Sequence, residues 1–244
     1  MSTIAYDQLV EELMSEAEQW KDIRAGIADL DAVLGGPSCR QGEKVNWTDD
    51  HAEDSVQWLP QAKSLLVLAM HHPENEPQLD WFERGNTAGN RRLTDISKTL
   101  ASWLLQTYGV RSQPLPYYVE RGGVYLKDAA VYAGLGVIGK NNLLLHPLWG
   151  PRVRLRALLI EDHLPPSAPL ENFDPCFTCD VQGENACPAG ALDCAQYRRQ
   201  ACMEQLERNR AHSSAGSKKD STGSADVIIK WCRECEFACP AGEK

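Results

Sequence analysis

The sequence predicts a mixed fold of helices and strands that ends in a small module built on metal-binding cysteines. Segments with helical periodicity alternate along the chain with short apolar runs of strand length. Nine cysteines occur in 244 residues, and only Cys39 precedes Cys176. We therefore expect a cysteine-poor main domain followed by a cysteine-rich one.

Composition narrows the class of protein further. The formal net charge is −9, and a body this acidic is a poor general binder of nucleic acid or of anionic membranes. No apolar run approaches the ~18 residues of a membrane span, and the first twenty residues show neither a basic leader nor an apolar signal core. We expect a cytoplasmic protein with no membrane partner, whose clustered thiols bind metal or carry out redox chemistry.

The expected elements follow from periodicity and from the positions of glycine and proline. Residues 4–20 carry apolar side chains at helical spacing and predict an amphipathic helix. In chain order there follow a buried strand at 64–70, a helix at 91–107, a strand at 116–120, a helix at 125–133, strands at 143–146 and 153–161, and a helix at 194–209. Polar or proline-rich stretches at 35–57, 162–175 and 209–226 predict loops, the last of them mobile.

Three arginines alternate with apolar residues in the last predicted strand. Arg152, Arg154 and Arg156 stand at every second position, so they share one face of a strand. One interpretation is a solvated face, and the other is a row of cations facing an anionic or amide-rich ligand. His71 and His72 close the earlier strand and are interpreted as structural rather than as axial ligands of a metal.

The cysteine-rich end contains an internal repeat. Cys176-x2-Cys179 leads to Cys187-Pro-Ala-Gly, and Cys232-x2-Cys235 leads to Cys239-Pro-Ala-Gly. In ferredoxin-type domains the Cys-Pro cysteine ligates the other cluster, so that the two halves interlock. A tetrathiolate zinc site is the rival, but zinc needs four sulfurs and has no use for the repeated Cys-Pro.

The same spacing assigns the cysteines to two groups. One cluster would be held by Cys187, Cys202, Cys232 and Cys235, and three ligands of another would be Cys176, Cys179 and Cys239. The usual third cysteine of the first motif would fall near Gln182 or Gly183, where none occurs. Either Asp180, Cys194 or a small molecule completes the second cluster, or only one cluster is present.

A glycine-rich segment precedes the module. Gly134, Gly136 and Gly139 match G-x-G-x-x-G, but a dinucleotide site requires a strand before the motif and a helix after it. Here the preceding residues look helical and the following ones extended, which argues against that site. Glycines still allow a close approach of backbone to a flat ligand, and Lys140 and Asn141 add hydrogen-bond donors beside it.

These residues together resemble a known family. The run AGLGVIGKNNLLL, the double cysteine motif and an isolated Cys202 between its halves are similar to epoxyqueuosine reductases and to their relatives, the reductive dehalogenases. The resemblance implies a nitroreductase-like α+β core over residues 1–165 that binds base-off cobalamin through the glycine segment. It implies a ferredoxin-like 4Fe-4S module over residues 166–244 that feeds electrons to cobalt.

The resemblance also implies a proton donor. Epoxyqueuosine reductases carry an aspartate thirteen residues before the alanine of AGLG, and that spacing falls on Glu120 here. Glutamate keeps the acid but reaches one methylene further, which changes its distance to a substrate. The alternative for Glu120 is a solvated carboxylate at the end of a strand.

The sequence thus predicts a cobalamin-dependent iron–sulfur reductase that uses cluster electrons to form cob(I)alamin and reduce a small substrate. The Gly-Arg-Asp-Tyr-His stretch of epoxyqueuosine reductases is replaced here by residues 89–93, and the chain stops after the second cluster motif. With the acidic net charge, we do not expect tRNA or other nucleic acid as a partner. Expected partners are a small-molecule substrate or corrinoid and a low-potential electron donor. The alternatives are an electron-transfer protein that reduces or carries a corrinoid, a flavin-binding iron–sulfur reductase, and a zinc-stabilised interaction domain.

Overall fold

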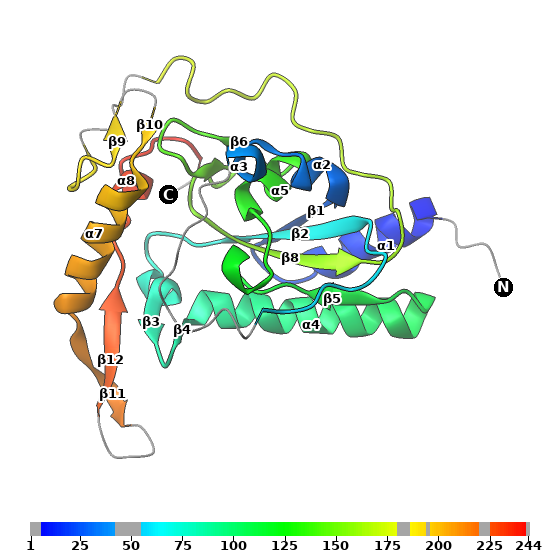
Figure 1. Cartoon of the computed structure of the whole chain (residues 1–244), viewed down its shortest axis with the longest axis horizontal. Coiled ribbons are helices and arrows are strands. Elements are labelled where there is room, and N and C mark those ends of the chain that lie inside the picture. The colour runs from blue at the N-terminus through cyan, green and yellow to red at the C-terminus, as the bar shows by residue number, and fades with distance from the viewer. Residues whose placement is uncertain (1–5, 42–54, 180–185, 194–195, 220–224, 243–244) are drawn as a thin grey trace. The chain divides into compact units, whose positions relative to one another are not determined.

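The computed structural model describes residues 6–41, 55–179, 186–193, 196–219 and 225–242 (Figure 1). The chain forms two compact units. The first takes in residues 1–71, 93–137 and 155–173, and the second takes in residues 72–92, 138–154 and 174–244. The second unit therefore holds the whole predicted cysteine module and two earlier stretches of the chain. The domain boundary at residues 165 and 166 remains a prediction.

The first unit is built on a four-stranded sheet in the order β1-β2-β8-β5. The strands are β1 (Ile23–Asp29), β2 (Ser64–His71), β5 (Ser112–Pro114) and β8 (Val153–Ile160). β1 lies antiparallel to β2, and β5 lies antiparallel to β8. Every residue of β2 except His71 is buried, as expected for a central strand covered on both faces.

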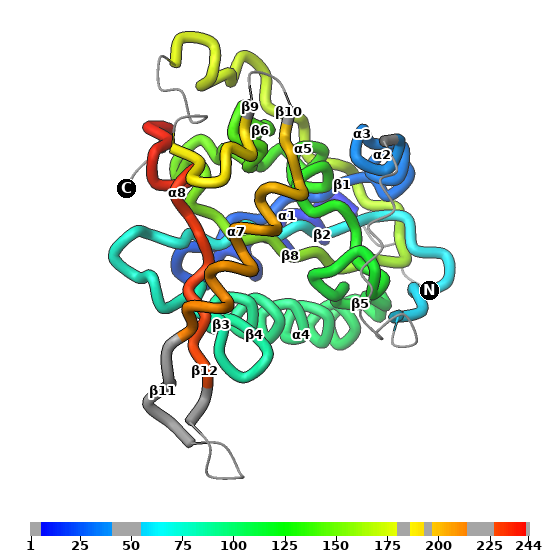
Figure 2. Tube along the Cα trace, turned by 60° about the vertical axis from the view of Figure 1, so that its left-hand side comes forward, coloured from blue at the N-terminus to red at the C-terminus, as the bar shows by residue number. Residues whose placement is uncertain are grey.

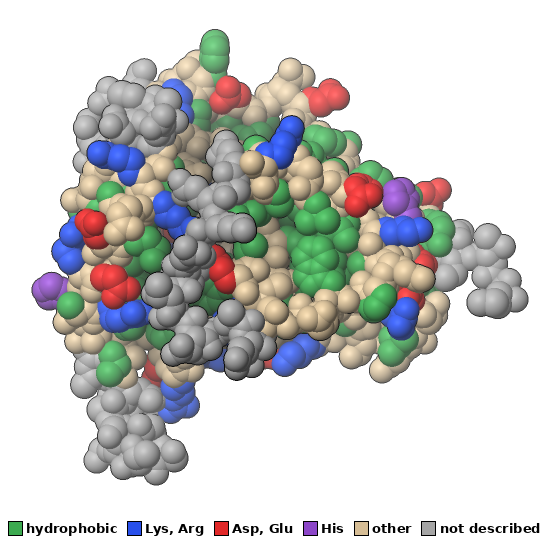
Figure 3. All heavy atoms as spheres, in the orientation of Figure 1, with side chains coloured by type: hydrophobic (Ala, Val, Ile, Leu, Met, Phe, Trp, Pro, Cys, Tyr) green, Lys and Arg blue, Asp and Glu red, His purple; other side chains and the backbone are tan. Residues whose placement is uncertain are grey.

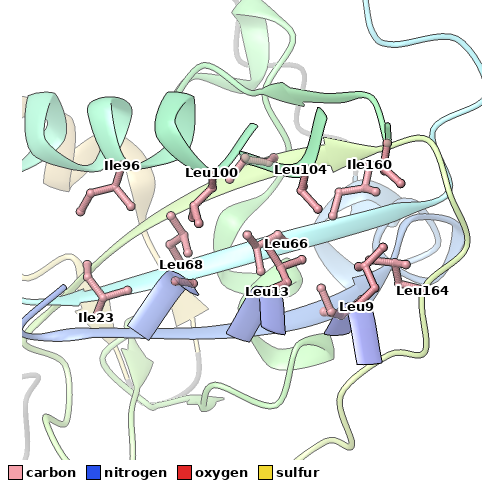
Figure 4. Packing of buried hydrophobic residues seen from close by; sticks show 14 of the residues in the cluster. Leu9, Leu13, Ile23, Leu66, Leu68, Ile96, Leu100, Leu104, Ile160 and Leu164 are labelled. Carbon is pink, nitrogen blue, oxygen red and sulfur yellow. The ribbon is translucent and has the colours of Figure 1, made fainter. Parts of the chain in front are cut away.

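Helices cover this sheet. They are α1 (Tyr6–Glu18), α2 (Leu30–Leu34), α3 (Pro37–Gln41), α4 (Ala88–Tyr108) and α5 (Leu126–Tyr132). Figure 4 shows the aliphatic side chains of α1 and α4 turned toward alternate residues of β2. The cluster includes Leu9 and Leu13 of α1, Leu66 and Leu68 of β2, and Ile96, Leu100 and Leu104 of α4. α5 contacts β1 and β2, and α2 contacts β1 and α5. This core is mainly aliphatic, and Trp20, Trp103 and Tyr108 pack against it.

The second unit contains a different sheet, in the order β11-β12-β3-β4. Its strands are β3 (Trp81–Glu83), β4 (Asn86–Thr87), β11 (Ser214–Lys219) and β12 (Ala225–Lys230), and a 3-10 turn at Pro77–Asp80 precedes β3. Figure 2 shows α7 (Arg199–Ala211) lying along β12. The remaining elements are the strand pairs β6 (Val137–Ile138) with β7 (Leu144–Leu145) and β9 (Leu192–Asp193) with β10 (Gln196–Tyr197), and the short helix α8 (Glu234–Phe237).

Several sequence predictions are confirmed and several are wrong. The helices at 4–20, 91–107 and 125–133 and the strands at 64–70 and 153–161 occur within a few residues of their expected bounds. The strand expected at 116–120 is instead a 3-10 turn at Val119–Arg121. The stretch 209–226, expected to be mobile, contains β11 and the start of β12. Strand β1 was not predicted at all.

The predicted mixture of helices and strands is confirmed. The nitroreductase-like core and the ferredoxin-like module stay predictions. No helix among the described residues combines the length and apolar character that crossing a bilayer requires.

Candidate functional site

The seven predicted cluster cysteines all lie in the second unit. Each is half-buried, and no disulfide joins the eight cysteines that the structure describes. The first group surrounds Cys235. Burial, together with the nearby sulfurs of Cys232, Cys202 and Cys187, raises the pKa of the Cys235 thiol to about 12. Burial likewise raises the pKa of Cys232, which also responds to Cys187 and Cys202. These four thiols lie within electrostatic reach of one another.

The second group surrounds Cys239. Burial raises the pKa of its thiol, and Cys176 and Cys179 add to that rise. The two sets of mutually influencing thiols have the same members as the two groups predicted from spacing. Both candidate replacement ligands, Asp180 and Cys194, lie outside the described residues, as do Gln182 and Gly183.

The thiols are gathered, but they do not converge on a point. Among the described residues, no group of three or more His, Cys, Asp or Glu side chains has the arrangement of a metal site. The donor set nevertheless fits an iron–sulfur cluster, because soft thiolate ligands select such clusters and bound metal removes the thiol protons. The backbone N–H of Ala191 already donates to Cys187 Sγ at 3.2 Å.

Tyr197 is a site residue that the sequence did not indicate. Burial raises the pKa of its hydroxyl, and a hydrogen bond with the Cys202 side chain raises it further. Cys235 also lies close enough to contribute. A phenol hydroxyl beside ligand sulfurs supplies a hydrogen-bond donor, which is one way in which proteins set cluster potentials. Only its position just before Cys202 could have suggested this role.

A buried network of charges surrounds the second CxxC motif. Arg233, between Cys232 and Cys235, donates to Glu236 and, through Nη1 at 3.0 Å, to Nε2 of His72. Arg154 pairs with Asp80 at 2.8 Å and with Glu236 at 3.3 Å. Two guanidinium groups thus face two carboxylates, which offsets the cost of burying them.

His72 is held neutral within this network. Burial, together with the positive charges of Arg154 and Arg233, lowers its pKa to about 3. Its Nε2 lies 3.0 Å from Arg233 Nη1 and 3.1 Å from Glu76 O, and its Nδ1 is buried without a hydrogen-bond partner in the described part of the chain. These contacts agree with the structural interpretation of His72.

The arginine row has neither of the two predicted roles. Arg152 and Arg156 are almost fully buried, so the strand face is not solvated. Arg152 is bonded to Glu74 and to backbone carbonyls, Arg154 to carboxylates, and Arg156 to Leu115 O and Thr94 Oγ1. The alternation of charge along β8 therefore reflects buried pairing with distant parts of the chain.

The predicted cofactor contacts are divided between the two units. Gly134 and Gly136 belong to the first unit, and Gly139, Lys140 and Asn141 belong to the second. A Cβ on Gly134 would stand 2.4 Å from Ala168 O, and one on Gly139 would stand 2.6 Å from Leu145 Cδ1. These two glycines are therefore required by packing of the chain against itself.

Asn141 is already engaged by the protein. Its Nδ2 donates to Cys235 O at 3.3 Å, and its Oδ1 accepts from Leu143 N at 3.2 Å. The described contacts of the glycine segment thus do not by themselves supply a corrinoid site. Helix α5 precedes this segment and extended chain follows it, which agrees with the argument against a dinucleotide site.

Glu120 lies in the first unit, in the 3-10 turn at Val119–Arg121, and its side chain is exposed. Two tyrosines stand just before it. Tyr117 is 50% exposed and Tyr118 is 45% exposed, and their rings meet edge to face with centroids 5.2 Å apart. The guanidinium of Arg121 lies 5.7 Å from the centre of the Tyr118 ring. Exposed aromatic residues and a cation therefore flank Glu120 along the chain.

Comparison with known proteins shows which proteins this chain resembles. No family model matches it. It is 25% identical over 219 residues to the epoxyqueuosine reductase of Bacillus cereus, covering 82% of this chain and 55% of that protein. It is 30% identical over 185 residues to the epoxyqueuosine reductase of Gloeobacter violaceus, covering 69% of this chain and 56% of that protein. The predicted resemblance to epoxyqueuosine reductases is confirmed. The chain spans about half the length of these curated relatives.

Solved structures show the same fold. A crystal structure of epoxyqueuosine reductase with an epoxyqueuosine-modified tRNA-Tyr stem loop matches with a TM-score of 0.66 and 21% identity, over 96% of this chain and 65% of that one. A catabolic reductive dehalogenase matches with a TM-score of 0.51 and 17% identity, over 75% of this chain and 26% of that one.

The tRNA complex corrects one prediction. Nucleic acid was not expected as a partner, and that expectation is wrong, because an epoxyqueuosine reductase of this fold is solved with a tRNA stem loop. A net charge of −9 is summed over the whole chain, whereas nucleic acid contacts a local surface. On the face drawn in Figure 3, the described basic and acidic side chains are interspersed. The sum of charges therefore does not exclude such a partner.

Proposed function

We propose that this chain is an iron–sulfur reductase of the epoxyqueuosine reductase type, in which cluster electrons reach an organic substrate through bound cobalamin. The observation that supports the iron–sulfur part is that seven half-buried cysteines with ferredoxin spacing lie in the same unit. Cobalamin is supported by the resemblance to the family, since the described glycine contacts do not test it. Bound cobalamin would supply a low-potential, nucleophilic cobalt centre.

Within this proposal the chain's own residues have separate tasks. The half-buried cysteines hold iron, and the Ala191 N–H and the Tyr197 hydroxyl stabilise sulfur charge at the first group. Glu120 donates a proton to the substrate or to its leaving group. Its exposure lets a substrate reach it from solvent, as a general acid must be within hydrogen-bonding distance of its target.

The surface beside Glu120 favours a flat heteroaromatic substrate. Exposed aromatic rings and arginine planes are the groups on which unpaired bases stack in RNA recognition. Tyr117, Tyr118 and Arg121 provide these groups next to the proposed acid. A modified nucleoside within an RNA stem loop is therefore the first substrate class to test.

Cofactor analysis tests the proposal. The protein is expressed with cobalamin supplied, purified anaerobically, and analysed for iron, cobalt, zinc and flavin together with its visible and EPR spectra. Iron with cobalt supports the proposal. Iron with flavin, iron without any tightly held cofactor, or zinc alone would contradict it and favour the flavin reductase, the electron-transfer protein or the zinc-stabilised domain, respectively.

Replacing Glu120 tests the acid. Glu120→Gln keeps the size of the side chain but cannot donate a carboxyl proton, so we expect turnover to fall by a factor of about 10² or more while iron and cobalt contents stay unchanged. Turnover equal to that of the unmodified protein, measured with an epoxide-containing RNA stem loop, would show that Glu120 has no such role. The matched control is Glu83→Gln, which makes the same change at a glutamate of strand β3.

A further inference from the structure

We propose that Arg152 positions Cys239 as a cluster ligand and acts on the group of Cys176, Cys179 and Cys239, leaving the other group unaffected. Arg152 can have this role only if these cysteines hold iron, as proposed above. It is a positioning residue, since it acts through the backbone of the Cys-Pro-Ala-Gly turn.

The guanidinium of Arg152 is fully buried, with 0% exposure, and it binds the ligand turn directly. Nη1 donates to Ala241 O at 2.9 Å, and Nη2 donates to Cys239 O at 3.1 Å. Nε donates to Glu74 Oε1 at 3.0 Å. The rigid fork of an arginine fixes two carbonyls at a set spacing, which a lysine cannot do. One side chain thus fixes the backbone on both sides of Pro240.

Backbone packing holds the same turn in place. A Cβ on Gly150 would stand 1.8 Å from Ala241 O, and one on Gly242 would stand 2.0 Å from Gly150 N. Both glycines have positive φ, +55° and +75°, so other residues would be strained there as well. The Cys-Pro-Ala-Gly turn therefore packs directly against the backbone of Gly150, and the Arg152 side chain bonds to the same turn.

The bonds of Arg152 reach one of the two cysteine segments. Its described partners are Glu74, Ala241 O and Cys239 O, and none of them lies in the segment of Cys232 and Cys235. A buried cation beside a cluster favours its reduced, more negative form. We expect the midpoint potential of the Cys239 cluster to depend on Arg152.

Arg154 is the natural comparison, because it stands two residues further along the chain, in strand β8. It pairs with Asp80 and Glu236, and Glu236 follows Cys235 directly in α8. The described bonds of Arg154 go to Asp80, Glu236 and Val153 O. The two arginines therefore support two different cysteine segments.

The experiment compares Arg152→Met, Arg152→Lys and Arg154→Met in the full chain after anaerobic reconstitution. Cys239→Ala and Cys235→Ala first identify the EPR signal that depends on each group. Arg152→Met is expected to lower the Cys239-dependent signal at least fivefold, or to shift its midpoint potential to more negative values, and to leave the Cys235-dependent signal intact. Arg154→Met is expected to disturb the Cys235-dependent signal instead. Arg152→Lys, which keeps the charge, should retain the midpoint potential better than Arg152→Met.

Unchanged signals and midpoint potentials in Arg152→Met would overturn the role of Arg152, and so would equal loss of both signals in both methionine variants, which indicates a general fold defect. A separate measurement works without iron. In the metal-free chain, amide hydrogen exchange of residues 239–242 should accelerate at least tenfold in Arg152→Met and stay unchanged in Arg154→Met. Equal exchange in the two variants would overturn the positioning role. Failure of the unmodified chain to take up iron would instead refute the proposed function, and the exchange result would still decide whether Arg152 holds this turn.

Discussion

Different forces stabilise the interiors of the two units of this protein. The first unit buries a continuous cluster of aliphatic side chains from α1, β2 and α4, and such burial is favourable without any bound group. The second unit buries few large apolar side chains among its described residues, but it encloses His72, Arg152, Arg233 and Glu236. A buried charge is tolerated only where its partner is in place. The first unit also buries Asp128 and Arg156, but they lie beside its apolar cluster, so we expect the second unit to depend more strongly on paired charges and, as proposed, on iron.

Removal of iron should produce the largest difference in stability between the two units. Metal binding to cysteine ligands contributes directly to the free energy of folding in small metal-built domains. We expect a chelator to abolish the thermal transition of the second unit or to lower its midpoint temperature sharply. Calorimetry and near-UV circular dichroism measure this transition. The transition of the first unit should remain. A single transition that moves as a whole would show that the two units do not differ in this way.

Breaking the charge network should have the next largest effect. Arg233→Met removes one of the two arginines that pair with the buried Glu236, and breaking a buried ion pair typically costs about 3–5 kcal/mol. Denaturant unfolding followed in the second unit measures this loss. Arg210→Met is the control, because Arg210 forms an exposed pair with Glu207 and should cost less than about 1 kcal/mol. Similar losses in the two variants would mean that burial of the network is not what stabilises the unit.

A cavity in the aliphatic core should affect only the first unit. Leu68 is completely buried in β2, so Leu68→Ala should lower the free energy of unfolding by about 2–5 kcal/mol. Iron content of the folded protein should not change. Leu105→Ala, at a leucine of α4 that is 54% exposed, should change stability by less than about 0.5 kcal/mol. An iron content that falls in Leu68→Ala would contradict the independence of the units.

Acid should have the smallest effect on the second unit for a change of one pH unit. His72 has its pKa lowered from 6.5 to about 3 by burial, Arg154 and Arg233, against an opposing effect of Asp80. Between these values the unfolded chain binds a proton that the folded chain does not. The free energy of unfolding should therefore fall as the pH drops from 6.5 toward 3, by about 1 kcal/mol per pH unit. His72→Gln should flatten this dependence, whereas replacing the exposed His163 by Gln should leave it in place.

Strongly periodic segments were predictable, and interrupted ones were not. α1, α4 and β2 were found because their apolar residues repeat at one clear period. β1 was missed because Arg24, Gly26 and Asp29 interrupt its apolar pattern. The strand predicted at 116–120 was wrong because Tyr117 and Tyr118 are exposed beside a turn. Aromatic residues favour strands only where a sheet surface receives them.

The candidate site shows the same division. The two cysteine groups could be proposed from the sequence because ferredoxin spacing is a local pattern, and their membership stays a prediction. The partners of those groups were not, because Tyr197, Glu236 and His72 carry no pattern that marks them. The arginine row was misinterpreted for the same reason, since Glu74 and Asp80 lie far from β8 in the sequence.

The amino-acid sequence by itself determined the main helices and strands, the concentration of thiols near one end, and the likeness to epoxyqueuosine reductases, because these depend on spacing along the chain. Only the tertiary structure decided that Arg152 holds the second Cys-Pro-Ala-Gly turn, that His72 is neutral, and that Asn141 bonds to the backbone of Cys235. Such roles depend on which distant groups share a buried, poorly screened environment, and burial is a property of the folded chain.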